Sequence, residues 1–167
     1  GAEIAPNVAA EYLPKRWVLG SLGPGTKLPT LLHVDYAQLE SSYFEAAKGL
    51  IEGGSDGLLV ETTQDLLQAK AAVNGSRRAI ASSKKDIVLI AQVTIETNGT
   101  MLLGSEIGAA LNALEPLGID LIGLNCATGP NEMSEHLRYL SQKSQVGISV
   151  MPNAGLPILG PNGAIYP

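Results

Sequence analysis

Five short apolar runs divide the chain at regular intervals. They are rich in Val, Ile and Leu and lack polar alternation, which is typical of strands covered on both faces, as in a parallel sheet. The five predicted strands cover residues 17–22, 57–61, 87–95, 121–125 and 147–151.

The segments between these runs have the periodicity of amphipathic helices. Apolar residues recur three and four positions apart, which predicts helices over residues 36–52, 65–81, 105–117 and 130–143. Successive strands begin about 27 to 40 residues apart, the length of a repeated βα unit. A (β/α)₈ barrel repeats at this interval but needs eight units and roughly 250 residues. On counting alone, a five-stranded flavodoxin-like open sheet is the alternative.

Composition narrows the functional classes. The chain has 167 residues, of which 45% are hydrophobic and only 16% charged, so it can bury a sizeable core. Its net charge of −5, without a basic stripe, argues against nucleic acid as a partner. No apolar run approaches the roughly 18 residues of a membrane span, and no signal-peptide pattern is present. The single cysteine excludes an intrachain disulfide, which predicts a reducing, cytoplasmic location.

Chemically useful residues stand where the predicted strands end. Glu61 follows the apolar residues 58–60, where it either binds a substrate ammonium group or pairs with an adjoining helix as a cap or salt bridge. Cys126 follows Asn125 at the end of the fourth strand, and a free cysteine there is either a small buried apolar residue or a functional thiol. Asn153 lies in a loop between two prolines, where it can bind a ligand or the loop itself.

The residues alone do not complete a catalytic dyad or a metal site. A cysteine nucleophile needs a nearby base, and the only histidines, His33 and His136, have no spacing that argues for one. A zinc site needs three or four ligands, so one cysteine and two scattered histidines are weak support.

Taken together, these strand ends resemble the homocysteine-binding domain of the homocysteine methyltransferases. The strongest likeness is Gly123-Leu-Asn-Cys-Ala-Thr-Gly-Pro130, because Gly-x-Asn-Cys followed by Gly-Pro is specific to this family. The run Pro-Asn-Ala-Gly-Leu-Pro at 152–157 is similar to the cobalamin-dependent methionine synthase branch. Further similar segments, in the family's order, are residues 18–24, 52–62 and 65–72.

This resemblance implies a fold and a reaction. The family fold is a (β/α)₈ barrel, in which three cysteine thiolates hold zinc and the homocysteine sulfur becomes the fourth ligand. The activated thiolate then takes the methyl group of methylcobalamin, while other domains handle cobalamin and methyltetrahydrofolate. By this resemblance Cys126 is the first zinc ligand and Glu61 receives the homocysteine ammonium. Asn125 and Asn153 are further candidates for the substrate pocket.

The chain departs from the family pattern in two places. The Gly-Gly-Cys-Cys-Gly run with the other two zinc ligands is absent, as is the Asp-Gly-x-x-Gly-Thr turn of the first strands. By analogy, residues 1–167 form a partial barrel domain of about five central βα units, without the first two strands and the last. We therefore expect an internal fragment that by itself lacks tight zinc and methyltransferase activity. Its partners would be the remaining barrel segments, or further copies that pair through exposed strand edges.

Two other functions compete with this interpretation. A homocysteine methyltransferase that uses a betaine or sulfonium donor would have the same strand ends. A non-catalytic binding or assembly module would keep Glu61 and the scaffold without the metal. The sequence does not distinguish the methyl donor.

Overall fold

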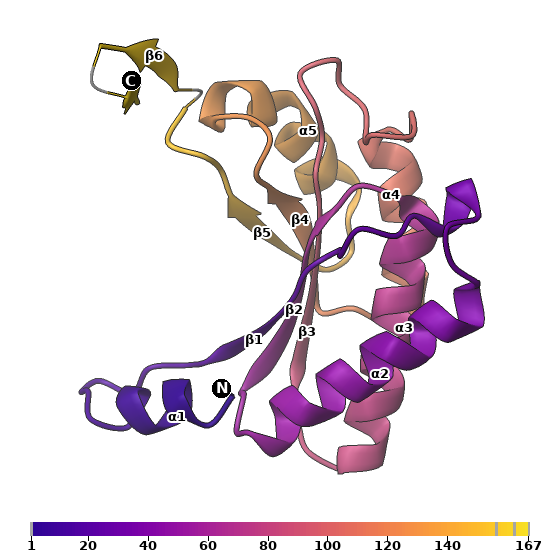
Figure 1. The fold of residues 1–167 in the computed structure, drawn as a ribbon, viewed down its shortest axis with the longest axis vertical. Coiled ribbons are helices and arrows are strands. Elements are labelled where there is room, and N and C mark those ends of the chain that lie inside the picture. Colours follow the sequence, from indigo (N-terminus) through magenta and orange to yellow (C-terminus); the bar gives the residue numbers. More distant parts are fainter. Residues whose placement is uncertain (1, 156, 162, 167) are drawn as a thin grey trace.

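Five parallel strands form one sheet in the computed structural model, which describes residues 2–155, 157–161 and 163–166 (Figure 1). Their order in the sheet, β1-β2-β3-β4-β5, is also their order in the chain. An open flavodoxin-like sheet would reverse direction at a switch point, whereas barrel strands follow one another in sequence. The strand order therefore favours the partial barrel. The strands are β1 (Leu19–Leu22), β2 (Gly57–Thr63), β3 (Val88–Val93), β4 (Leu121–Asn125) and β5 (Gly147–Met151).

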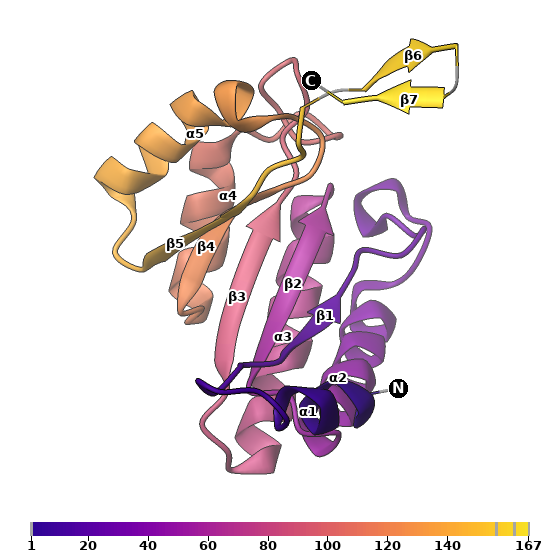
Figure 2. The same cartoon turned by 90° about the vertical axis from the view of Figure 1, so that its left-hand side faces the viewer.

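Four helices lie along one face of this sheet, and a short one precedes it (Figure 2). Asp35 and Asp65 cap the starts of α2 and α3 by accepting hydrogen bonds from backbone N–H groups of the first turn. Among the described residues, no helix has the length and hydropathy that a bilayer crossing requires. The helices are α1 (Ile4–Ala9), α2 (Tyr36–Glu52), α3 (Leu66–Ser83), α4 (Ile107–Leu114) and α5 (Pro130–Lys143), with 3₁₀ turns η1 (Pro29–Leu31) and η2 (Glu115–Leu117).

The predicted elements are confirmed, but several of their bounds are wrong. Trp17 is 68% exposed and precedes β1, because strand pairing begins only at Leu19. The helix predicted to reach residue 117 ends at Leu114, where Pro116 converts the last turn to 3₁₀ geometry. The elements predicted from the sequence do not include α1, η1 or a hairpin of β6 (Ile158–Gly160) and β7 (Gly163–Ile165).

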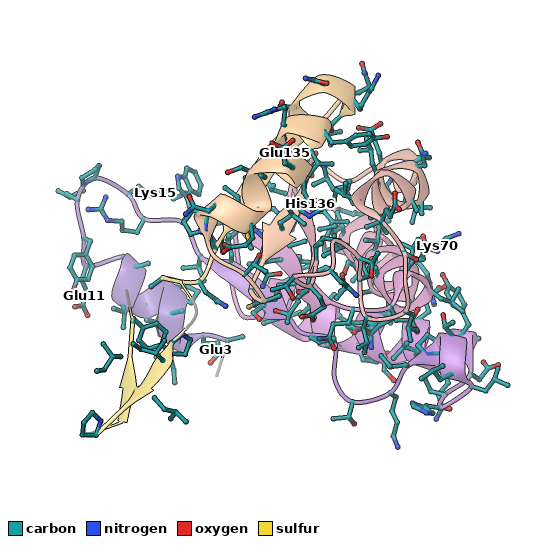
Figure 3. The ribbon with its side chains drawn as sticks, turned by 90° about the horizontal axis from the view of Figure 1, so that it is seen from above. Glu3, Glu11, Lys15, Lys70, Glu135 and His136 are labelled. Carbon is teal, nitrogen blue, oxygen red and sulfur yellow. The ribbon has the colours of Figure 1, made fainter. Side chains whose placement is uncertain are left out.

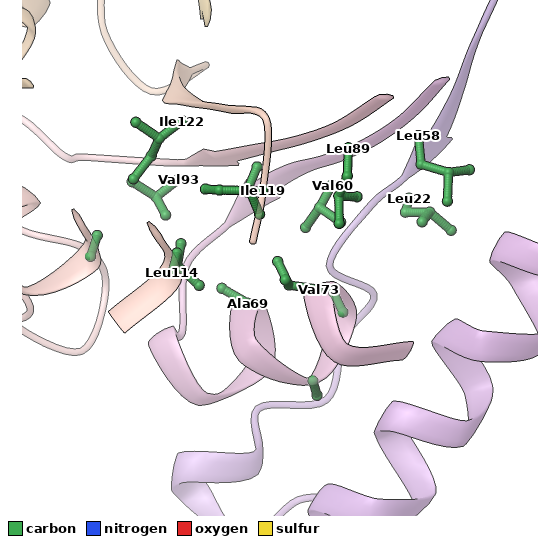
Figure 4. Close-up of a cluster of buried hydrophobic side chains, with 14 of the residues drawn as sticks. Leu22, Leu58, Val60, Ala69, Val73, Leu89, Val93, Leu114, Ile119 and Ile122 are labelled. Atoms are coloured by element: carbon green, nitrogen blue, oxygen red, sulfur yellow. The ribbon is translucent and has the colours of Figure 1, made fainter. Parts of the chain in front are cut away.

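The core lies between the sheet and the helices (Figure 4). Alternate strand residues point into it, so on β2 Leu58 and Val60 are fully buried against the helices while Leu59 and Glu61 belong to the opposite face. The same alternation and the strand register place one polar residue of every strand on that opposite face, toward the carboxyl edge. These residues are Ser21, Glu61, Gln92, Asn125 and Ser149.

The loop that follows β1 is held against α2 and α3. Tyr43 donates a hydrogen bond from its hydroxyl to the carbonyl of Gly23 at 3.1 Å, and burial raises the pKa of Tyr43 to about 12. Gln68 donates to two loop carbonyls, at 2.6 and 2.9 Å. The buried carboxylate of Asp65 accepts hydrogen bonds from both the backbone and the hydroxyl of Thr30. The end of β1 is thereby fixed relative to the strands beside it.

Both outer strands of the sheet carry exposed apolar side chains. Leu19 on β1 is 40% exposed, and on β5 Val150 and Met151 are 42% and 45% exposed. Edge strands with such surfaces favour further pairing. The association through strand edges expected above therefore stays a prediction.

The closest approach of α2 and α3 supplies a test of this packing. A methyl group on Gly75 would lie 2.6 Å from the carbonyl oxygen of Glu40 and 2.8 Å from the amide of Phe44, which are backbone atoms. We expect Gly75→Ala to lower the free energy of unfolding by about 1–3 kcal/mol, measured by urea denaturation. Gly49→Ala is the matched control, since it adds a methyl group in open space within α2.

The control should raise stability by up to about 1 kcal/mol, because alanine favours the helix more than glycine. A Gly75→Ala chain as stable as the unmodified chain would contradict this packing of α2 against α3.

Candidate functional site

A buried asparagine joins the carboxyl ends of β2 and β4. Asn125, only 2% exposed, accepts a hydrogen bond through Oδ1 from the backbone N–H of Thr62 at 2.8 Å. Its Nδ2 donates to the hydroxyl of Thr62, also at 2.8 Å. Strand β3 lies between β2 and β4, so this carboxamide links two strands that are not neighbours in the sheet.

The carboxylate of Glu61 lies beside this link and is surrounded by neutral donors. Ser21 donates its hydroxyl proton to Oε1 at 2.5 Å, while Nδ2 of Asn125 lies 3.4 Å from Oε2. In the part of the chain that the structure describes, no Lys, Arg or His forms an ion pair with Glu61. The salt bridge to an adjoining helix, one alternative from the sequence, is therefore not found there. A half-buried carboxylate without a cation favours binding a positively charged group.

The backbone at Glu61 is irregular. Glu61 and Thr62 on β2 lie opposite the single residue Gln92 on β3, which makes a β-bulge. Thr62 has a left-handed backbone conformation, with φ of 57°, which a β-branched residue adopts only at an energetic cost. The two hydrogen bonds between Thr62 and Asn125, one donated by each residue, offset this strain. Bulges commonly redirect side chains next to active sites.

Cys126 extends the same cluster. Its sulfur lies 3.3 Å from Nδ2 of Asn125 and 3.7 Å from the hydroxyl of Thr62. Its φ is 58°, and its N–H donates to the carbonyl of Met151 at 3.2 Å, which fixes the turn against the end of β5. The thiol is half-buried and has polar neighbours, and a functional role for it stays a prediction.

The other candidates from the sequence lie outside this cluster. The backbone N–H of Asn153 donates to the carbonyl of Thr128 at 3.1 Å, which holds its loop against the turn after Cys126. Leu156, in the same run 152–157, lies outside the described residues. His33 accepts a hydrogen bond from Leu28 within its own loop, and His136 lies on α5 (Figure 3). Within the described residues, no hydrogen bond joins Cys126 to either histidine.

A complete metal centre does not fit these residues. No group of three His, Cys, Asp or Glu side chains that could hold a metal occurs in residues 2–155, 157–161 and 163–166. Cys126 offers one soft ligand, whereas a structural or catalytic zinc needs at least three from protein.

Two members of the cluster were missed from the sequence. Ser21 lies in the strand predicted over residues 17–22 but carried no chemical signal, and Thr62 had none apart from its position after Glu61. The alternation of side chains along β1 is the signal that identifies Ser21. Gly20 and Leu22 are buried, so Ser21 points to the other face of the sheet.

Comparison with known protein families gives a match over the whole chain. The family model for homocysteine S-methyltransferase matches residues 1–167. The methionine synthase of Mycobacterium tuberculosis is 64% identical over 170 residues, and that of Mycobacterium leprae is 62% identical. Each alignment covers the whole of this chain but only 14% of the longer protein.

A solved structure shares the fold. The metallated form of the homocysteine methyltransferase MmuM from Escherichia coli superposes with a TM-score of 0.71 at 17% identity. The match covers 90% of this chain and 54% of that one. At this identity the likeness concerns the fold alone, and it confirms the barrel type of architecture.

The role of Asn125 can be tested by replacing its side-chain carboxamide with a carboxylate. Asn125→Asp removes the donor to Thr62 and places a second carboxylate beside Glu61. We expect the free energy of unfolding at neutral pH to fall by about 1–3 kcal/mol, because a buried donor is lost and like charges repel. Urea denaturation measures the change.

Asn98→Asp is the matched control, since Asn98 is exposed and acts only as an acceptor for Thr100. It should change stability by less than about 0.5 kcal/mol. Equal effects of the two substitutions would show that the link between β2 and β4 contributes nothing.

Proposed function

Because the chain belongs to the homocysteine S-methyltransferase family, we propose that it is part of the homocysteine-binding barrel of a methionine synthase. Residues 1–167 would supply the central βα units, and the remaining strands would come from polypeptide outside this chain. The identity to two methionine synthases supports this branch of the family. The reaction would be transfer of a methyl group from methylcobalamin to the homocysteine thiol.

The observation that carries the proposal is the pairing of an uncompensated carboxylate with a thiol. Nδ2 of Asn125 lies 3.4 Å from the Glu61 carboxylate and 3.3 Å from the Cys126 sulfur, so both groups flank one nitrogen atom. Homocysteine is a short molecule with an ammonium group near one end and a thiol at the other. Glu61 would bind the ammonium, and the homocysteine thiol would lie near Cys126.

The surrounding residues would orient this substrate. Asn125 is tied to Thr62 by two hydrogen bonds of 2.8 Å, so it is held in one orientation. It would separate the ammonium end of the pocket from the thiol end. Asn153, on the loop beside the turn after Cys126, would line the pocket from β5.

Cys126 would be one of three cysteine ligands of a zinc ion. The other two would come from outside this chain, because the described residues do not supply them. Zinc, when bound, would favour the thiolate form of homocysteine at neutral pH. Methylcobalamin would be presented by other domains of the longer polypeptide.

Steady-state kinetics on the complete gene product that carries this chain test the proposal. Glu61→Gln should raise KM for L-homocysteine about 10- to 100-fold with a much smaller change in kcat, because a charge-assisted contact to the ammonium is lost. Glu96→Gln is the matched control, since this half-buried glutamate follows the neighbouring strand β3. The two variants should differ clearly; equal KM values, or a gene product without homocysteine methylation, would refute the proposal.

The zinc content expected of this chain alone differs from that expected of the longer enzyme. After dialysis, elemental analysis of the 167-residue chain should find well below one zinc per chain, because one thiolate does not hold the ion tightly. Added homocysteine should not change this result. Stoichiometric zinc that is lost in Cys126→Ser would mean that Cys126 has other partners, and the assignment of two ligands to polypeptide outside the chain would be wrong.

A further inference from the structure

We infer that Ser21 is a positioning residue for Glu61 and thereby sets a preference for thiols that carry an amino group. The inference rests on the proposed function, since it assigns the Glu61 carboxylate to a substrate ammonium. It adds a residue from β1, a strand in which the sequence alone indicated no site residue.

The strand register places Ser21 diagonally across from Glu61 on the same face of the sheet. Ser21 pairs with Leu59 in the parallel ladder between β1 and β2, and Leu59 is two residues before Glu61 on the same face. The hydroxyl therefore reaches diagonally toward the carboxyl edge, a separation that cross-strand neighbours can bridge. The result is the contact of 2.5 Å between Oγ of Ser21 and Oε1 of Glu61.

This contact is the shortest that Glu61 makes with a side chain among the described residues. The other carboxylate oxygen is 3.4 Å from Asn125 and 3.5 Å from the hydroxyl of Thr62. A glutamate side chain has three rotatable bonds, and the bulge at Glu61 and Thr62 interrupts the regular ladder beside it. The Ser21 hydroxyl is therefore the main restraint on the direction of the carboxylate.

A hydroxyl suits this task because it orients the carboxylate without neutralising it. A lysine or arginine here would satisfy the charge and compete with a substrate ammonium. Ser21 donates one proton to one oxygen, which leaves the full negative charge and further acceptor positions for the ligand. Its backbone belongs to a strand whose following loop is held by Tyr43 at Gly23, so the donor is held rigidly.

The test compares two ligands that differ only in the amino group. On the complete gene product that carries this chain, KM and kcat are measured for L-homocysteine, and the inhibition constant is measured for 4-mercaptobutanoate. For Ser21→Ala we expect KM to rise about tenfold while kcat stays within about twofold. The inhibition constant should not change, because 4-mercaptobutanoate has no ammonium group. Ser21→Thr, which keeps the hydroxyl, should restore KM.

The variants distinguish this inference from the proposed function. Ser141→Ala, an exposed serine on α5, is the matched control and should leave both constants unchanged. If Glu61→Gln raises KM and Ser21→Ala does not, the inference is wrong while the proposed function stands. Equal weakening of both ligands by Ser21→Ala, without rescue by threonine, would assign Ser21 a merely structural role and overturn the inference. If Glu61→Gln leaves KM unchanged, both are overturned.

Discussion

The carboxamide of Asn125 is the contact on which the whole carboxyl edge depends. It crosses the end of β3 to hold Thr62 on β2, and both Thr62 and the neighbouring Cys126 have left-handed backbone conformations. Such conformations cost on the order of 1–3 kcal/mol each and persist only where surrounding contacts compensate them. The carboxamide supports the bulge at Glu61 and Thr62, and it acts together with the hydrogen bond from Cys126 to Met151 at the turn. Asn125, which is almost fully buried, thereby helps to position Thr62 and Cys126, which are less buried.

The electrostatics of the cluster follow from this arrangement. Among the described residues, the groups that donate to Glu61 are neutral hydroxyls and an amide, so the carboxylate is oriented without an ion pair. A half-buried carboxylate without a cation is unfavourable for stability. The cost is typical of a binding site, in which the ligand supplies the missing charge.

The chain also shows how far a partial barrel can build such a site. Five strands bring a carboxylate, a carboxamide and a thiol together, since all parallel strands end at the same edge. The described residues do not supply a complete metal site, because Cys126 is the one thiol among them and no group of three metal-binding side chains occurs there. In the proposed function, binding of a substrate ammonium would depend on two neighbouring strands, β1 and β2. The proposed zinc site would need further ligands from outside this chain.

The sequence by itself determined the parallel α/β architecture, the order of its elements and the strand ends that carry Glu61, Asn125 and Cys126. These follow from short-range signals: apolar runs, helical periodicity and a Gly-x-Asn-Cys motif. Only the tertiary structure decided that Ser21 donates to Glu61, that Thr62 completes the bulge, and that no side-chain cation of the described residues pairs with the carboxylate. The β6–β7 hairpin, too, is known only from the tertiary structure. The physical reason is that register and side-chain contacts between strands about 40 to 60 residues apart depend on how the whole sheet packs, which no local pattern encodes.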